Sequence, residues 1–79
     1  MNNSERYKKT FINSLSVDKN LDLEKLKYND IQEWDSIGHM SLISGLEEEF
    51  KVTFETDQII NFSSFKKGKE ILSKLGVKV

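Results

Sequence analysis

The sequence predicts an all-α fold: a four-helix up-and-down bundle with three long helices, one short third helix and a long first loop. Three observations support this fold. Apolar residues recur at helical spacing in several stretches, serine, asparagine or aspartate precedes those stretches, and no segment alternates like a strand for long. With 79 residues and no proline, the chain is expected to form a single domain, 1–79.

The first helix is expected over residues 4–15. Tyr7, Phe11 and Leu15 recur at four-residue spacing and form one apolar stripe, and Asn3 or Ser4 can cap the start. Residues 16–34 contain apolar side chains without a single period. They are therefore expected to form a long ordered loop, attached to the core by its side chains and holding one helical turn.

The second helix is expected over residues 36–51. On a wheel of about 100° per residue, its core face consists of Leu42, Ile43, Leu46 and Phe50. The same wheel places His39 on that face near its open end, Ser36 at its edge and Ile37 on the opposite side. A serine therefore borders the core while the isoleucine beside it faces water.

The last two helices are predicted from residues that typically start or end a helix. A third helix is expected over residues 56–61. Ser63 or Ser64 caps a fourth that reaches about residue 75, where Gly76 ends it.

Charge and composition exclude several classes of function. The net charge of −1 argues against a partner made of nucleic acid. Acidic residues dominate 18–57, where eleven acids face four lysines, and the flanking segments are basic. No apolar stretch resembles a signal peptide or is long enough to cross a membrane, so no membrane partner and a cytoplasmic location are expected. With no cysteine and one histidine, no metal site is expected.

Ser36 stands at the entrance of the second helix, inside the stretch WDSIGHM. An ordinary cap explains Asp35 and Ser36, but it explains neither the outward-facing Ile37 nor the helix-weakening Gly38 in the first turn. A catalytic serine would need an oriented base and an oxyanion hole, and no G-x-S-x-G elbow is present, so no catalytic residue is expected. A hydroxyl at this exposed end can instead be modified, because the helix dipole and the free N–H groups favour a phosphodiester.

The chain resembles the acyl carrier proteins. The resemblance rests on Asp35-Ser36-Ile37 at the start of the second of four helices, on the helix ending LEEEF at 46–50, and on Thr56-Asp57 at the start of a short third helix. It implies that Ser36, flanked by Asp35 and Ile37, carries a covalent 4′-phosphopantetheine derived from coenzyme A. The protein would then hold acyl intermediates as thioesters and present them to enzymes, without catalytic activity of its own.

The resemblance also implies partners and two surfaces. The partners are a phosphopantetheinyl transferase, an acyl- or aminoacyl-loading enzyme, and downstream synthases or transferases. The protein itself is expected to be a monomer. The partner surface comprises Ile37, Ser41, Ser44, Glu47 and Glu48. The cargo pocket between the second and third helices comprises His39, Met40, Ile43, Leu46, Phe54, Ile59 and Phe62, although a plain core role is the better explanation for most of these residues.

Two alternatives remain open. Where housekeeping fatty-acid carriers have several carboxylates, this chain has Gly38, His39, Ser41 and Ser44. That departure favours a free-standing carrier of a specialised pathway, including an aminoacyl or peptidyl carrier. The other alternative is a helical interaction module that is never modified.

Overall fold

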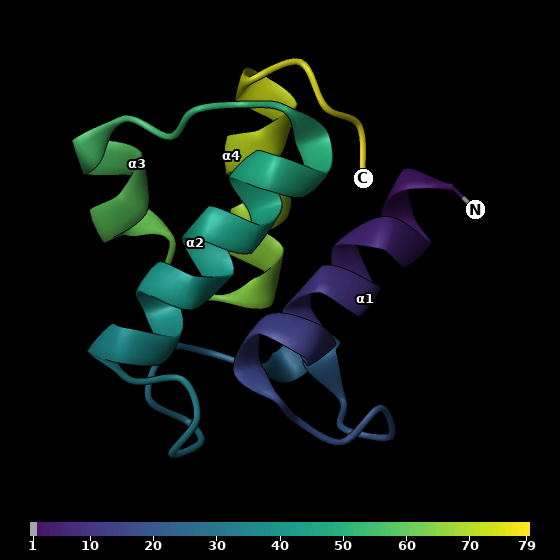
Figure 1. Cartoon of the computed structure of the whole chain (residues 1–79), viewed down its shortest axis with the longest axis vertical. Helices are drawn as coiled ribbons and strands as arrows, with labels where there is room; N and C mark the ends of the chain where they lie inside the picture. Colours follow the sequence, from purple (N-terminus) through teal and green to yellow (C-terminus); the bar gives the residue numbers. More distant parts are fainter. Residues whose placement is uncertain (1) are drawn as a thin grey trace.

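The computed structural model describes residues 2–79 and is built from helices (Figure 1). In chain order the elements are α1 (Asn3–Leu15), the single 3-10 turn η1 (Leu23–Lys25), α2 (Ser36–Phe50), α3 (Thr56–Asn61) and α4 (Phe65–Lys74). Residues 2–79 contain no strand, only an isolated bridge between Lys27 and Ser64. The all-helical prediction is therefore confirmed.

α1 begins one residue earlier than expected. Asn2 has an extended backbone, and its Oδ1 accepts a hydrogen bond of 2.8 Å from the N–H of Glu5. The prediction of Asn3 or Ser4 as the cap is wrong, because Asn2 already supplies the side-chain oxygen that a helix start requires. α1 ends at Leu15, as expected, because Ser16 after it has a left-handed φ of 55°.

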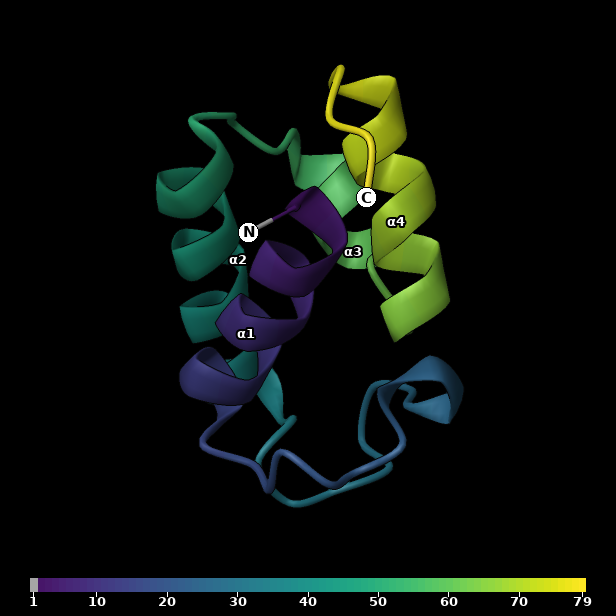
Figure 2. The same ribbon diagram turned by 90° about the vertical axis from the view of Figure 1, so that its right-hand side faces the viewer.

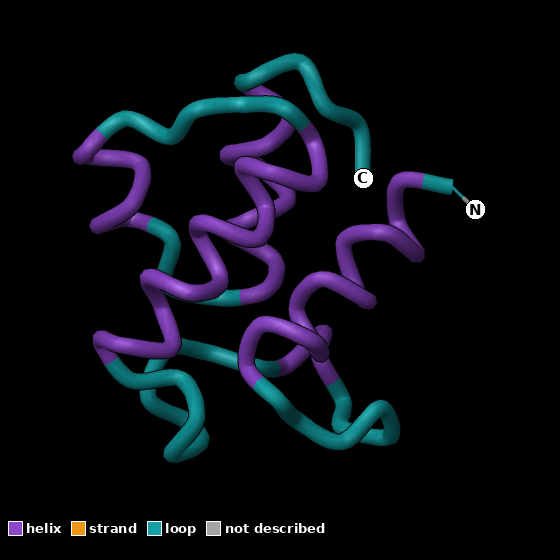
Figure 3. Tube along the Cα trace, viewed as in Figure 1, coloured by secondary structure: helices purple, strands orange, loops and turns teal. Residues whose placement is uncertain are grey.

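The loop between α1 and α2 is long and ordered, and it contains one helical turn, as expected (Figure 3). Backbone hydrogen bonds join it to the start of α4: the N–H of Tyr28 donates to the carbonyl of Ser63 at 2.9 Å, and the N–H of Phe65 donates to that of Leu26 at 3.0 Å. These bonds explain how a segment with little regular structure satisfies its backbone groups.

The ends of the other helices follow the sequence closely. α2 stops at Phe50 because Lys51 takes a left-handed φ of 56°. At the start of α3, the Oε1 of Gln58 accepts the N–H of Glu55 at 2.8 Å. Of the two candidate caps for α4 it is Ser64 that acts, accepting the N–H of Lys67 at 2.9 Å, and Gly76 follows the helix with a φ of 91°.

The core between the helices is rich in aromatic rings. The predicted stripe of Tyr7, Phe11 and Leu15 is buried, and the Phe11 ring lies 5.1 Å from Trp34 and 5.0 Å from Phe65. The Tyr7 hydroxyl donates to the carbonyl of Phe65 at 2.6 Å, and burial raises the pKa of this phenol. The core thus joins α1, the first loop and α4.

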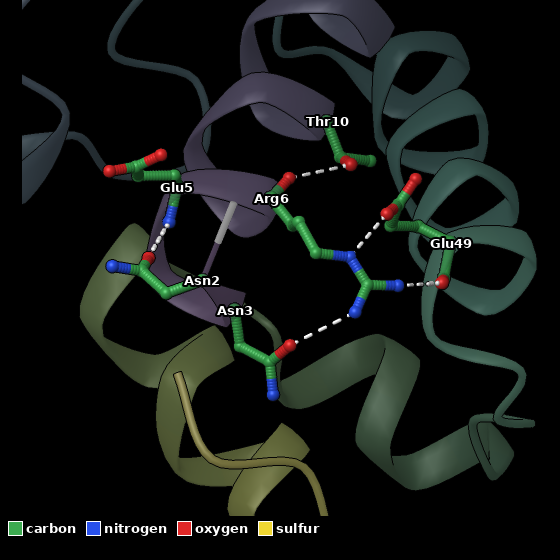
Figure 4. A network of polar contacts seen from close by, with 6 residues as sticks. All are labelled: Asn2, Asn3, Glu5, Arg6, Thr10 and Glu49. Atoms are coloured by element: carbon green, nitrogen blue, oxygen red, sulfur yellow. Dashed lines mark hydrogen bonds and ion pairs between the residues drawn. The ribbon is translucent and has the colours of Figure 1, made fainter.

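Arg6 attaches α1 to the far end of α2 (Figure 4). Its Nε donates to Glu49 Oε2 at 2.6 Å, its Nη2 to the Glu49 carbonyl at 2.7 Å, and its Nη1 to Asn3 Oδ1 at 3.0 Å. The guanidinium also lies 4.9 Å from the ring centre of Phe50. Because a helix end leaves its last carbonyls unpaired, these contacts stabilise the C-terminal end of α2.

α4 lies behind α2 in Figure 1, and α1 lies to one side of both, so Figure 2 shows α1 in front with α2 and α4 on either side of it. Within residues 2–79, no helix combines the length and the apolar character that a bilayer crossing requires.

Candidate functional site

Ser36 is the first residue of α2, and its side chain is exposed. The helix is capped by its neighbour: Oδ1 of Asp35 accepts the N–H of Gly38 at 2.8 Å, and the Asp35 carbonyl accepts the N–H of His39 at 2.8 Å. The Ser36 hydroxyl makes no hydrogen bond to residues 2–79. Asp35 therefore performs the capping, and the serine oxygen is left free for another role.

The backbone around Ser36 has free donors. The first N–H groups of an α-helix have no partner within the helix. Asp35 satisfies the N–H of Gly38, so those of Ser36 and Ile37 remain unpaired with any group of residues 2–79. These donors lie at the positive end of a 15-residue helix, where an anion is favoured.

Gly38 is required by packing. A Cβ at this position would overlap the carbonyl oxygen of Glu33 and would lie 3.2 Å from Cδ2 of Leu15. The loop can cross the first turn of α2 this closely only because residue 38 lacks a side chain. The glycine that capping alone does not explain therefore sets how the loop meets the Ser36 end of the helix.

The outer face of α2 carries an apolar pair beside Ser36. Ile37 is 78% exposed, which confirms the wheel prediction, and Met40 is 52% exposed. Around them is a shallow, open depression of about 730 Å³, whose remaining lining residues are Ser36, Ser41, Ser44, Gly45 and Glu48. We call this depression the α2 groove.

Two residues predicted for the site lie elsewhere. Glu47, expected on the partner surface, is half-buried and does not line the α2 groove, because its Oε2 accepts the N–H of Phe54 at 2.9 Å. Met40, expected in the cargo pocket, instead lines the α2 groove. Both assignments are corrected by the structure: Glu47 stabilises the connection from α2 to α3, and Met40 faces out.

His39 connects three parts of the chain. Its Nδ1 lies 2.9 Å from Nε1 of Trp34, and its Nε2 lies 2.8 Å from the carbonyl oxygen of Ile59. Since the indole N–H can only donate and a carbonyl can only accept, Nδ1 accepts and Nε2 carries the proton. The neutral ring therefore links the first loop, α2 and α3, and neither nitrogen is free to act on Ser36.

A second, smaller hollow of about 290 Å³ lies beside this link, and its lining is mainly apolar. The residues that line it are Tyr28, His39, Ile59, Ile60, Phe62 and Ser63. We call it the α3 pocket. His39 belongs to the first turn of α2, three residues after Ser36, so the pocket opens about one helical turn from the serine.

The α3 pocket contains only part of the predicted cargo set. His39, Ile59 and Phe62 line it, whereas Ile43, Leu46 and Phe54 are at most 4% exposed and belong to the core. Sequence reasoning missed Tyr28, Ile60 and Ser63. Tyr28 is one of the apolar residues without a period in the first loop, and this was the only hint of its role. The pocket forms because Tyr28 lies across from α3, and no local sequence pattern reveals that contact.

Lysine side chains surround Glu24 where η1 meets α4, and we call this cluster of Lys8, Lys66 and Lys69 the basic surface. Nζ of Lys69 lies 2.9 Å from Oε2 of Glu24, and this hydrogen bond, followed by the charges of Lys69, Lys8 and Lys66, lowers the pKa of Glu24. Among residues 2–79, no three acidic or histidine side chains are arranged to hold a metal ion.

The chain matches no protein-family model, no curated protein and no solved structure. Its function must therefore be inferred from its own residues and their geometry.

Proposed function

We propose that this chain is a carrier protein of the acyl carrier type, with a 4′-phosphopantetheine arm attached to Ser36, and that it presents acyl intermediates to partner enzymes. The observation that carries the proposal is the free, exposed hydroxyl of Ser36 at a helix start that Asp35 already caps. The order of elements supports it too, because three longer helices, a short α3 and a long first loop suit a four-helix carrier bundle.

The residues around Ser36 fit the proposed group. The unpaired N–H groups of Ser36 and Ile37 would bind the phosphodiester oxygens, and the dipole of α2 favours their negative charge. When bound, the group supplies the thiol that this cysteine-free chain lacks. Asp35 holds the first turn of α2 in place while leaving the serine oxygen open to the transferase.

The α2 groove is the proposed docking surface. Ile37 and Met40 provide apolar area next to the attachment point, and Ser41, Ser44 and Glu48 surround it. Glu48 is the only carboxylate in the groove. Recognition by the transferase, the loading enzyme and the downstream enzymes therefore depends more on apolar contact than on charge, which supports a specialised pathway over housekeeping fatty-acid synthesis.

The geometry of His39 argues against an enzyme that uses Ser36 as its own nucleophile. A general base needs a free lone pair within hydrogen-bonding reach of the serine, and the Nδ1 lone pair of His39 accepts from Trp34 instead. An aminoacyl or peptidyl carrier would use the same serine and groove with a different cargo. An interaction module would use the groove alone.

Intact-mass analysis after incubation with coenzyme A and a broad-specificity phosphopantetheinyl transferase tests the proposal. We expect the wild type to gain one phosphopantetheine, Ser36→Ala to gain none, and Ser73→Ala to be modified like the wild type. Ser73 is the matched control, since it is an exposed serine of α4 that does not line the α2 groove. An unchanged wild-type mass, with an active transferase on a known carrier, would leave the interaction module as the better account.

A further inference from the structure

The α3 pocket has walls made of aromatic rings. The Tyr28 and His39 rings meet edge to face with centres 5.4 Å apart, and His39 and Phe62 do the same at 5.9 Å. Phe62 is 1% exposed and lies deepest, whereas Tyr28 is 37% exposed and lies at the rim. Ile59 and Ile60 of α3, together with Ser63, complete the lining.

The pocket is short. At about 290 Å³ its volume lies just below the usual range for ligand sites. Ile43 and Leu46, which belong to the core, are 1% and 0% exposed, so close-packed side chains lie between the helices behind the pocket. An extended alkyl chain therefore has no room to lengthen inward, while a compact group fits.

The polar character of the lining selects for a neutral group. No acidic side chain lines the pocket, and both nitrogens of His39 are already bonded. A buried ammonium would find no counter-charge there, which makes its burial costly. The hydroxyls of Tyr28 and Ser63 have no hydrogen-bond partner among residues 2–79, so they are available to a carbonyl or amide of the ligand.

From these contacts we infer that the α3 pocket binds a neutral aromatic acyl group, of the size of a benzoyl group, carried on the arm at Ser36. The inference rests on the proposed function for the attachment at Ser36, but the affinity of the pocket for such a ring does not depend on it. The rings of Tyr28, His39 and Phe62 present both faces and edges, and an aromatic guest gains edge-to-face contacts beyond its buried area. The attachment point is near, because Ser36 and His39 are three residues apart in the first turn of α2 and are neighbours on the helix surface.

Binding of free probes tests the pocket without any modification of the chain. The probes are N-ethylbenzamide and N-ethylcyclohexanecarboxamide, which match in size and amide and differ in aromaticity. In NMR titrations of the unmodified protein, we expect the amide signals of Tyr28, Ile59, Ile60 and Ser63 to shift. The benzamide should bind about tenfold more tightly, because its ring gains edge-to-face contacts that the cyclohexyl ring does not make. Equal affinities, or shifts centred on other residues, overturn the inference.

Variants of the lining residues test whether the probes bind in the α3 pocket. Tyr28→Leu removes one ring and keeps apolar bulk, so it should reduce the preference for the benzamide while the cyclohexyl probe still binds. Ile60→Ala, at a position that is 74% exposed, should weaken both probes with little effect on folding. Met40→Leu in the α2 groove is the control and should change neither. An unchanged preference in Tyr28→Leu, or an effect of Met40→Leu equal to that of Ile60→Ala, contradicts the aromatic pocket.

Loaded protein distinguishes failure of this inference from failure of the carrier function. Arms at Ser36 bearing benzoyl, cyclohexanecarbonyl and decanoyl groups are compared by thermal melts, with the largest rise expected for benzoyl. If Ser36 is modified but decanoyl stabilises most, the carrier function stands and the aromatic cargo is wrong. If Ser36 is never modified but the benzamide preference is found, the pocket stands and the carrier function is wrong.

Discussion

Replacing His39 by leucine tests the link between the first loop, α2 and α3. The Trp34 side chain is fully buried, so its N–H would lose the Nδ1 acceptor with no water to replace it. An unsatisfied buried donor costs about 1–3 kcal/mol. The carbonyl of the half-buried Ile59 would also lose its donor, but water can reach it and the added cost is small. The expected loss of unfolding free energy is about 2 kcal/mol.

The measurement is urea denaturation followed by circular dichroism, with a thermal melt beside it. For a domain of this length, about 2 kcal/mol corresponds to a fall in Tm of about 8–16 °C. Trp34→Phe and the double variant complete a double-mutant cycle. Because removing both partners leaves no unpaired donor, the double variant should be less destabilised than the sum of the single ones, by about 1 kcal/mol. A His39→Leu protein within about 0.5 kcal/mol of the wild type, or strictly additive variants, would refute the reasoning.

Three further variants test the docking surface, the core and the basic surface. Ile37→Ala should change stability by no more than about 0.5 kcal/mol but slow modification of Ser36 in a transferase assay, and a large fall in Tm would show that Ile37 is not a surface residue. Burial, and to a smaller extent the negative charge of Glu24, raises the pKa of Tyr7. Above about pH 10 the phenol of Tyr7 therefore stays protonated in the folded state, whereas it loses its proton in the unfolded state. Stability should therefore fall from about pH 10 upward, by as much as about 1.4 kcal/mol per pH unit, and Tyr7→Phe should lose that slope in denaturation series across alkaline pH. In Lys69→Met, the pKa of Glu24 should rise toward its ordinary value in an NMR titration, and an unchanged value would show that the ion pair does not form in solution.

Local signals predicted most of the helix ends. Asp35 and Ser64 cap α2 and α4 through N–H groups three residues further along the chain. The exposure of Ile37 followed from its angle on the helix alone. These features depend on residues within one or two turns, so their causes are present in any short window of sequence.

The limits of the sequence show at Glu47, which was expected on the partner surface and is half-buried in the structure. It turns inward because the chain reverses after α2 and brings the N–H of Phe54 to its carboxylate. Gly38 is a second case, since its role depends on how the carbonyl of Glu33 crosses the helix. A periodic pattern describes the faces of one helix, but it does not predict which residues of the connecting segments contact that helix.

By itself, the sequence determined that this chain is all-helical, where most of its helices begin and end, and that a serine stands at an exposed helix start. Only the tertiary structure decided that both nitrogens of His39 are hydrogen-bonded and that Tyr28 and Ile60 share a pocket. The physical reason is the range of the interactions. Helix formation and capping depend on neighbours in the chain, whereas the pocket requires residues 28, 39 and 60 to meet, and their meeting depends on how the aromatic core packs the helices together.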